Sequence, residues 1–346
     1  MTVQRLRKES KIVIRGDSAA ASCCAHLLTN AGFKPVLQRA GRARLPAIML
    51  SEAALALMRD VFERPDLFHT APRITRRVVK WGRNAEPVAL DHAAVVVSER
   101  ELLNALQPQT ELLDEPTADE SDFTIFASRP LPSDTVEHCF GSRVASAAPV
   151  RLKDADDSAS CWIESLKDGW LFLIPDAAES GWLLSVGCPL QEIPEHSSLI
   201  AGRIELMNGA AGQFPASPRI VSPLCGPGWI ACGTAGMAFD PICGDGTAHA
   251  VREAILAAAV VRAVSNGGDT TELLRHYEAR LTVGFQRHLA ACLDFYRSGH
   301  GGPWWEKELE LLIQGMEWCA AKLASYREFR YRLNGFELRS IDNGPA

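Results

Sequence analysis

The chain is 346 residues long, 47% of them are hydrophobic, and its formal net charge at pH 7 is −6. This length allows one large domain or two fused lobes. The negative charge argues against a nucleic-acid or anionic-membrane surface. Charged residues interrupt the apolar runs, so we expect no membrane span. No signal-peptide core follows the basic N-terminal residues, and we expect a cytoplasmic protein.

The ten cysteines are scattered along the chain and contain no C-x-x-C pair. Zinc sites and thioredoxin-like redox motifs both depend on such short spacings. The sequence therefore predicts reduced, mostly buried thiols and no metal site.

The chain opens on a strand–turn–helix–strand pattern. Residues 11–15 form an apolar strand, a turn begins at Gly16, and a small-residue helix leads to a second strand at residues 36–39. This is the context of the dinucleotide fingerprint G-x-G-x-x-G, whose small residues let the backbone approach a pyrophosphate. Ser18 and Ala21 stand at its second and third positions. Small-residue helix starts are common in α/β proteins, so this motif alone is not specific.

The next part of the chain mixes helices and strands. The repeating apolar face of residues 46–63 predicts a helix. Residues 73–81 and 92–98 read as strands, and the acidic segment 108–122 reads as an exposed connection. A further strand is expected over residues 123–129.

From residue 136 to residue 190 the pattern becomes rich in strands. Residues 160–166, 169–174 and 181–186 alternate and are separated by turn residues, which predicts an antiparallel meander. From Thr271 onward the apolar residues follow a helical period, interrupted by the glycine-rich segment 298–303.

Residues 228–247 are the most informative segment. They predict a buried strand, a small-residue turn, Asp240-Pro241, and Gly244-x-Gly246 at the start of an alanine-rich helix. Such a helix start offers free backbone N–H groups and a partial positive charge, which suit an electron-rich ligand lying against the backbone. The alternative interpretation is a glycine-rich turn that caps an ordinary packing helix.

These segments together resemble the FAD-dependent hydroxylase superfamily, typified by p-hydroxybenzoate hydroxylase and the tryptophan halogenases. Residues 228–247 are similar to the family pattern G-D-A-A-x-x-x-D-P-x-x-G-x-G, and residues 127–129 resemble the end of its D-A-S-G-R strand. Trp170-x-Phe172-x-Ile174-Pro175 is similar to the halogenase segment W-x-W-x-I-P. The nearest subgroup looks like the flavoproteins that mature tryptophylquinone cofactors by hydroxylating a peptidyl tryptophan.

The resemblance implies an α/β fold with an α+β second lobe. A Rossmann-like FAD-binding lobe is interrupted by an antiparallel β-sheet substrate lobe, and the C-terminus is helical. We expect a FAD-binding domain of residues 1–70, 92–135 and 215–270, a substrate domain of residues 71–91 and 136–214, and a C-terminal helical region of residues 271–346.

The resemblance also implies which residues form the site. Those expected to contact FAD are Gly16, Ser18, Ala21, Arg39, Gly233, Thr234, Asp240, Pro241, Gly244, Asp245 and Gly246. Trp170 and Phe172 are expected to line a substrate pocket. Lys80 is a candidate for the lysine that tryptophan halogenases place beside their substrate, although it also reads as a surface lysine, and the catalytic residue stays unassigned.

The chain departs from the family pattern at several places, among them Ser18 and the short segment 107–123, and two of the departures concern hydrogen bonds to the cofactor. Arg39 stands where an acidic residue would hold the adenosine ribose, and a guanidinium cannot accept those hydrogen bonds. Thr234 replaces the aspartate of the G-D pair, which removes charge assistance from that contact. Each lost hydrogen bond weakens cofactor binding by roughly 1 kcal/mol.

Three functions follow from this sequence. Our prediction is a FAD-dependent oxidoreductase, a monooxygenase that acts on a small aromatic substrate or on a tryptophan of a partner polypeptide, with NAD(P)H or another reductant. The alternative is a degenerate flavoprotein-fold binding or assembly protein that has lost tight FAD binding. A third reading is an NAD(P)-linked reductase, in which Arg39 meets a 2′-phosphate.

Overall fold

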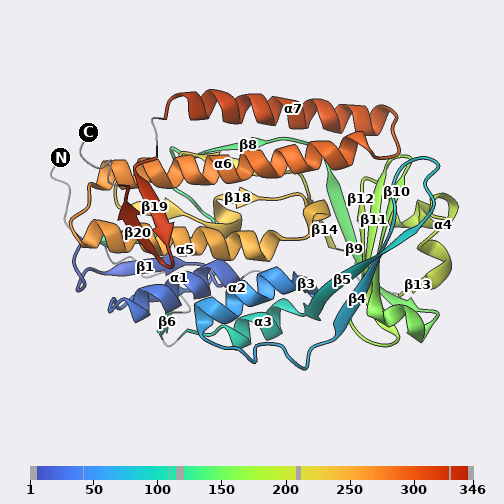
Figure 1. Cartoon of the computed structure of the whole chain (residues 1–346), viewed down its shortest axis with the longest axis horizontal. Coiled ribbons are helices and arrows are strands. Elements are labelled where there is room, and N and C mark those ends of the chain that lie inside the picture. The colour runs from blue at the N-terminus through green and yellow to red at the C-terminus, as the bar shows by residue number, and fades with distance from the viewer. Residues whose placement is uncertain are drawn as a thin grey trace.

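The computed structural model describes residues 6–41, 43–108, 110–113, 121–207, 212–326 and 329–341. A parallel sheet with its helices occupies one end of the molecule and a large antiparallel sheet the other (Figure 1). Two long helices, α6 (Thr270–Arg297) and α7 (Pro303–Ala324), run along one side of both parts. The predicted fold class is confirmed.

The parallel sheet has six strands in the order β16-β17-β7-β1-β2-β6. Every neighbouring pair is parallel except β16 with β17. The strands are β1 (Ile12–Arg15), β2 (Val36–Gln38), β6 (Glu111–Leu113), β7 (Phe123–Phe126), β16 (Cys225–Gly226) and β17 (Trp229–Ala231). All four residues of β7 are buried, as expected for a parallel strand covered on both faces.

Two helices pack together beside this sheet. α1 (Ala19–Asn30) follows β1, and α5 (Gly246–Ser265) follows the segment after β17. Both are rich in alanine, which allows their backbones to approach closely. The remaining helices are α2 (Glu52–Phe62), α3 (Glu99–Ala105) and the short α4 (Ile193–His196).

The second sheet has nine strands in the order β13-β9-β12-β11-β10-β4-β5-β3, with β14 also paired to β9. It is antiparallel apart from the β10–β4 pair. The predicted meander is β10 (Ser160–Leu166), β11 (Gly169–Pro175) and β12 (Ser180–Val186). The other strands are β3 (Ile48–Ser51), β4 (Arg73–Lys80), β5 (Val88–Val97), β9 (Val144–Leu152), β13 (Ile204–Leu206) and β14 (Gly212–Pro215).

Three local expectations were wrong. The helix predicted from residue 46 begins only at Glu52, because the residues before it pair with β5 as β3. Strand β6 lies within the segment expected to be an exposed connection, and residues 114–120 lie outside the described residues. Beyond α7 the chain forms a hairpin, β19 (Tyr331–Asn334) and β20 (Glu337–Ser340), and not helix.

The expected domain boundaries differ from the observed topology in two places. The boundary at residue 92 lies inside β5, and β3 belongs to the large sheet although it precedes residue 70. A third small sheet, β18-β15-β8, links β8 (Val136–Cys139), β15 (Arg219–Ser222) and β18 (Met237–Ala238). Buried hydrophobic residues of both parts form one contiguous cluster, so the division into domains stays a proposal.

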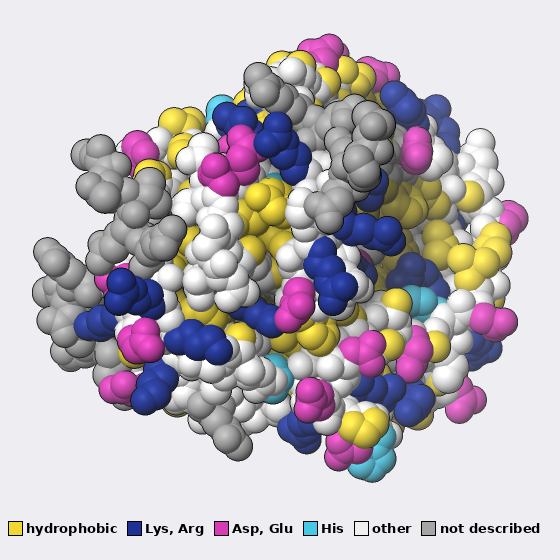
Figure 2. Space-filling model, turned by 60° about the vertical axis from the view of Figure 1, so that its left-hand side comes forward, with side chains coloured by type: hydrophobic (Ala, Val, Ile, Leu, Met, Phe, Trp, Pro, Cys, Tyr) yellow, Lys and Arg dark blue, Asp and Glu magenta, His cyan; other side chains and the backbone are white. Residues whose placement is uncertain are grey.

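Charged side chains are mixed on the molecular face in Figure 2, where acidic and basic groups alternate around hollows that show hydrophobic side chains. That face presents no large area of one sign. Among the helices that the structure describes, none combines the length and the hydropathy needed to cross a membrane.

Candidate functional site

A cavity of about 290 Å³ lies where β3, the large sheet and the segment before α5 meet. Its size is at the lower end of the range for small-molecule sites. Its walls are mainly apolar, from Ile48, Leu50, Ala147, Phe172, Ile174, Trp182, Leu184, Phe214 and Phe239. The structure brings six predicted site residues together here: Asp240, Pro241, Gly244, Asp245 and Gly246 for the cofactor and Phe172 for the substrate.

The start of α5 is open toward this cavity. Asp245 is the N-cap, but its side chain makes no capping hydrogen bond and is paired instead with Arg252 at 2.9 Å. No atom outside the local chain lies within 4 Å of the place where a Cβ on Gly246 would be. The first N–H groups of a helix have no partner within it and carry partial positive charge, so this end can accept an electron-rich ligand.

Gly244 is required for the turn that leads into α5. Its φ of +63° lies in the left-handed region, which glycine adopts without strain. It follows the 3₁₀ turn η5 (Pro241–Cys243), where the Asp240 carboxylate accepts the N–H of Ile242 at 2.9 Å. The sequence signal Asp240-Pro241 therefore corresponds to a turn that the aspartate itself caps.

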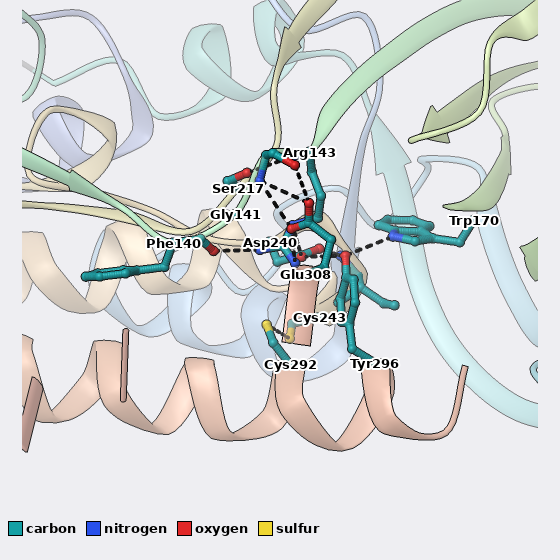
Figure 3. Close-up of polar contacts among 12 residues, drawn as sticks. Phe140, Gly141, Arg143, Trp170, Ser217, Asp240, Cys243, Cys292, Tyr296 and Glu308 are labelled. Carbon is teal, nitrogen blue, oxygen red and sulfur yellow. Dashed lines mark hydrogen bonds and ion pairs between the residues drawn. The ribbon is translucent and has the colours of Figure 1, made fainter. Parts of the chain in front are cut away.

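A buried polar network holds this turn from behind (Figure 3). The other carboxylate oxygen of Asp240 accepts the Tyr296 hydroxyl at 2.9 Å and lies 3.2 Å from Nε of Arg143. Arg143 also pairs with Glu308 at 3.3 Å, and its guanidinium stacks 4.7 Å from the centre of the Tyr296 ring. All these side chains are fully buried or nearly so, so the network is a rigid support.

The charges of this network do not balance, since one guanidinium faces two carboxyl groups. Burial raises the pKa of Asp240, and the neighbouring Arg143 is the main influence that opposes this. The carboxyl group is therefore closer to neutral than a surface aspartate. Its role is to position the turn, because both of its oxygens are already engaged by protein groups.

The start of α1, the other predicted cofactor contact, is occupied by the chain's own side chains. The Ser18 hydroxyl accepts the N–H of Ala21 at 3.3 Å. Arg44 forms an ion pair with the Asp17 carboxylate and donates to the Asp17 carbonyl oxygen at 2.7 Å. A phosphate group at this end would meet both the capping hydroxyl and the aspartate charge.

Gly16 is explained by packing at this same end. Its φ is +126°, and a Cβ there would lie 3.0 Å from the backbone of Ala127 and Ser128. The turn therefore needs glycine because the strand end that was compared with D-A-S-G-R lies directly against it.

The remaining predicted cofactor contacts do not line the cavity. Gly233 donates its N–H to the buried carboxylate of Glu253 at 2.7 Å and packs against Ala20. Thr234 is exposed in the neighbouring 3₁₀ turn η4 (Gly233–Ala235), and Arg39 is exposed directly after β2. Burial raises the pKa of Glu253 to about 8, so this carboxyl is mainly neutral at pH 7.

Of the predicted substrate and catalytic residues, one lines the cavity and two do not. Phe172 lines the cavity, whereas Trp170 is fully buried and donates from Nε1 to the Tyr296 hydroxyl at 3.2 Å. Lys80 is not part of the cavity wall, and its ammonium donates to the hydroxyl of Ser198. Lys80, at the end of β4, therefore does not border this cavity.

A second, larger cavity of about 800 Å³ lies between α5, α6 and the β19–β20 hairpin. Phe239 and Asp245 line both cavities. The Phe239 ring stacks on His249 with centroids 4.3 Å apart. The segment before α5 therefore faces a cavity on each side, which its sequence did not indicate.

No protein-family model and no curated protein sequence matches the chain. Solved structures do match. The flavin-dependent halogenase CmlS has a TM-score of 0.73 at 16% identity, over 91% of this chain and 71% of its own. The peptidyl tryptophan dihydroxylase QhpG has a TM-score of 0.70 at 19% identity, over 96% of this chain and 86% of its own.

The p-nitrophenol 4-monooxygenase PnpA from Pseudomonas putida DLL-E4 has a TM-score of 0.65 at 14% identity, over 92% of this chain and 98% of its own. These similarities extend over nearly the whole chain. The chain has the fold that FAD-dependent halogenases and hydroxylases share, as its sequence motifs predicted.

Proposed function

We propose that the protein is a FAD-dependent oxidoreductase, a monooxygenase that acts on an aromatic substrate. The observation that carries the proposal is the open start of α5, where Gly244 and Gly246 line an apolar cavity on the fold of flavin-dependent enzymes. Since one fold hosts many functions, the argument depends on this site and not on the fold alone.

The described residues fit the ring end of the cofactor. The backbone N–H groups of Gly246 and Thr247 would hold its electron-rich edge, and the helix dipole would favour negative charge there. The network of Arg143, Asp240 and Tyr296 would keep the turn rigid. When bound, FAD supplies the redox and oxygen chemistry, and the protein supplies orientation and exclusion of water.

The walls of the cavity favour an aromatic substrate. Phe172, Trp182, Phe214 and Phe239 can stack on a ring or meet it edge-on. QhpG, which shares the fold, is a peptidyl tryptophan dihydroxylase, and by that analogy the finer form of the proposal is a tryptophan of a partner polypeptide. NAD(P)H or another reductant would supply the electrons.

The first experiment is a flavin titration of the purified full chain. We expect flavin absorption bands to remain with the protein after gel filtration from excess FAD, and riboflavin to bind as well because the ring site is the intact one. NAD(P)H-driven oxygen consumption with aromatic substrates then tests the activity.

A pair of glycine variants locates the site. Gly246→Val places a side chain in open space beside the cavity and should weaken flavin binding at least about tenfold, the equivalent of roughly 1.4 kcal/mol. Gly202→Val is the control. Gly202 also faces open space, but it belongs to an exposed turn that does not line the cavity. Equal flavin affinity in both variants would contradict the proposed ring site.

A second function is supported by the start of α1. Since Ser18 caps that helix start and Asp17 is paired with Arg44, the chain also fits a binding or assembly protein that no longer holds FAD. Failure to bind any flavin, even at millimolar concentration, would favour this function, and a search for a protein partner would follow.

A further inference from the structure

Two cysteines and one histidine lie together beside the turn before α5. Cys243 belongs to η5, and His288 and Cys292 are one turn apart on α6, with the two sulfur atoms facing each other in Figure 3. One ligand atom from each residue lies within 4.8 Å of the other two. The spacing rules for zinc motifs miss this set because Cys243 comes from a different element.

Two of the three ligand–ligand distances are close to those of a tetrahedral metal site. With Zn–S bonds of about 2.3 Å and Zn–N bonds of about 2.0 Å, tetrahedral angles place two sulfur ligands about 3.8 Å apart and a nitrogen about 3.5 Å from a sulfur. The Sγ atoms of Cys243 and Cys292 are 3.9 Å apart, and Nε2 of His288 is 3.3 Å from Sγ of Cys292.

Burial and chemistry support the same reading. Cys292 is fully buried, His288 is almost so, and Cys243 is partly exposed. Two thiolates and one imidazole are the ligand types that zinc and similar borderline-soft metals prefer. Both cysteines are unbonded thiols in the structure, so they are available as ligands.

The site would keep one position open. Cys243 and His288 both line the 800 Å³ cavity, together with His249. Three protein ligands plus an open fourth position characterise zinc sites that bind water or another ligand, whereas purely structural sites are closed by four protein ligands. A small molecule in the cavity could therefore reach the metal.

We propose that Cys243, His288 and Cys292 bind one zinc-like divalent metal ion whose fourth position faces the large cavity. The metal would tie η5 to α6 and so hold the turn that carries Gly244. At present Nε2 of His288 accepts the backbone N–H of Asp240 at 2.8 Å. A metal bound at Nε2 would take this lone pair, so binding would exchange the hydrogen bond for a metal–nitrogen bond, and the Asp240 N–H would have to find another acceptor.

A cobalt titration tests the proposal. The full chain is reduced with a phosphine, freed of metal by chelation, and titrated with Co²⁺ alone. We expect a thiolate-to-cobalt charge-transfer band in the near ultraviolet and the visible d–d bands of a tetrahedral site, both saturating at one Co²⁺ per chain. Added Zn²⁺ should remove them.

Matched cysteine variants identify the ligands. Cys243→Ser and Cys292→Ser should each weaken the charge-transfer band, and Cys243→Ser carries little risk to folding because that residue is partly exposed. Cys139→Ser and the buried Cys319→Ser should leave the spectrum unchanged. Circular dichroism confirms that each variant is folded.

Two results would overturn the proposal. They are the absence of cobalt bands when thiol titration shows both cysteines reduced, and bands that persist in both site variants. The titration contains no flavin, so its failure leaves the proposed oxidoreductase function untouched.

Discussion

The two helix starts that the sequence offered as cofactor contacts differ in what occupies them. At α1, Ser18 caps the helix and Asp17 is paired with Arg44. At α5, Asp245 makes no capping bond and Gly246 faces open space beside the cavity. At the first end, the chain's own side chains cap one N–H and place a carboxylate beside the helix, whereas the second end leaves backbone donors that a ligand can satisfy.

In the proposed flavin site, the two halves of the cofactor would therefore depend on different parts of the fold. The ring end depends on backbone geometry that the buried network around Asp240 maintains. The nucleotide end depends on the buried side chains of Asp17 and Ser18 and on the partly exposed Arg44. We therefore expect the ring half of FAD to contribute most of its affinity here.

The largest expected effect is the difference in stability lost when the ion pairs behind these two helix starts are removed. Arg143→Met leaves the carboxyl groups of Asp240 and Glu308 buried without their cation, so the free energy of unfolding should fall by about 3–5 kcal/mol. Arg44→Met breaks a partly exposed pair and should cost no more than about 1 kcal/mol. Urea unfolding measures both, and similar losses would remove the contrast.

The second effect concerns Glu253, which joins the two ends by holding Gly233 against α1. Its pKa is raised by burial from 4.5 to about 8. The folded state thus binds a proton that the unfolded state has released between these values, so stability falls as pH rises, by about 1.4 kcal/mol per pH unit in that window. This stability is complete below pH 4.5 and is lost through pH 8.

Glu253→Gln keeps an acceptor for the Gly233 N–H and does not titrate. Relative to this variant, the wild-type chain should lose stability between pH 5 and pH 8, as measured by urea unfolding at intermediate values. Glu192→Gln, on an exposed turn, serves as the control. Parallel pH profiles of wild type and Glu253→Gln would show that the carboxyl ionises normally.

A smaller difference is expected between the N-cap residues of α1 and α5. Ser18→Ala removes the side chain that accepts the Ala21 N–H and should lower the free energy of unfolding by about 1 kcal/mol. Asp245→Ala removes only a dipole interaction and an exposed ion pair, which together are worth about 0.5 kcal/mol. Thermal unfolding of the two variants tests this order, and its reversal would mean that α5 is capped in solution.

The smallest effect would reopen the nucleotide end. Asp17→Asn removes negative charge next to the start of α1 and frees Arg44 to meet a phosphate. FAD affinity should rise about twofold to fivefold, the equivalent of roughly 0.3–1 kcal/mol, while riboflavin affinity stays the same. An equal change for both flavins would indicate that Asp17 acts on the whole site and not on the nucleotide half.

The elements with strong local patterns could be predicted from the sequence. The strand that became β1, the meander of β10, β11 and β12, and helix α5 all follow hydrophobic period and turn chemistry. Residues 46–51 were predicted as helix because their composition is ambiguous, and only pairing with β5 makes them a strand.

The site could be predicted only where one continuous segment builds it. Asp240, Gly244 and Gly246 belong to a single motif and lie together at the cavity. Arg143 lies in the connection before β9, Tyr296 in α6 and Glu308 in α7, and no spacing along the chain predicts that they meet. The pairing of Asp17 with Arg44 also depends on the path of the loop between β2 and β3.

The strand order of the parallel sheet has a consequence for synthesis of the protein. Val13 of β1 pairs with Thr124 of β7, which pairs in turn with Trp229 of β17. Contacts between segments so far apart in sequence are slow to form because long loops must close first. Until residue 231 leaves the ribosome, β7 lacks its β17 partner and is an edge strand, and such unpaired edges favour aggregation during synthesis.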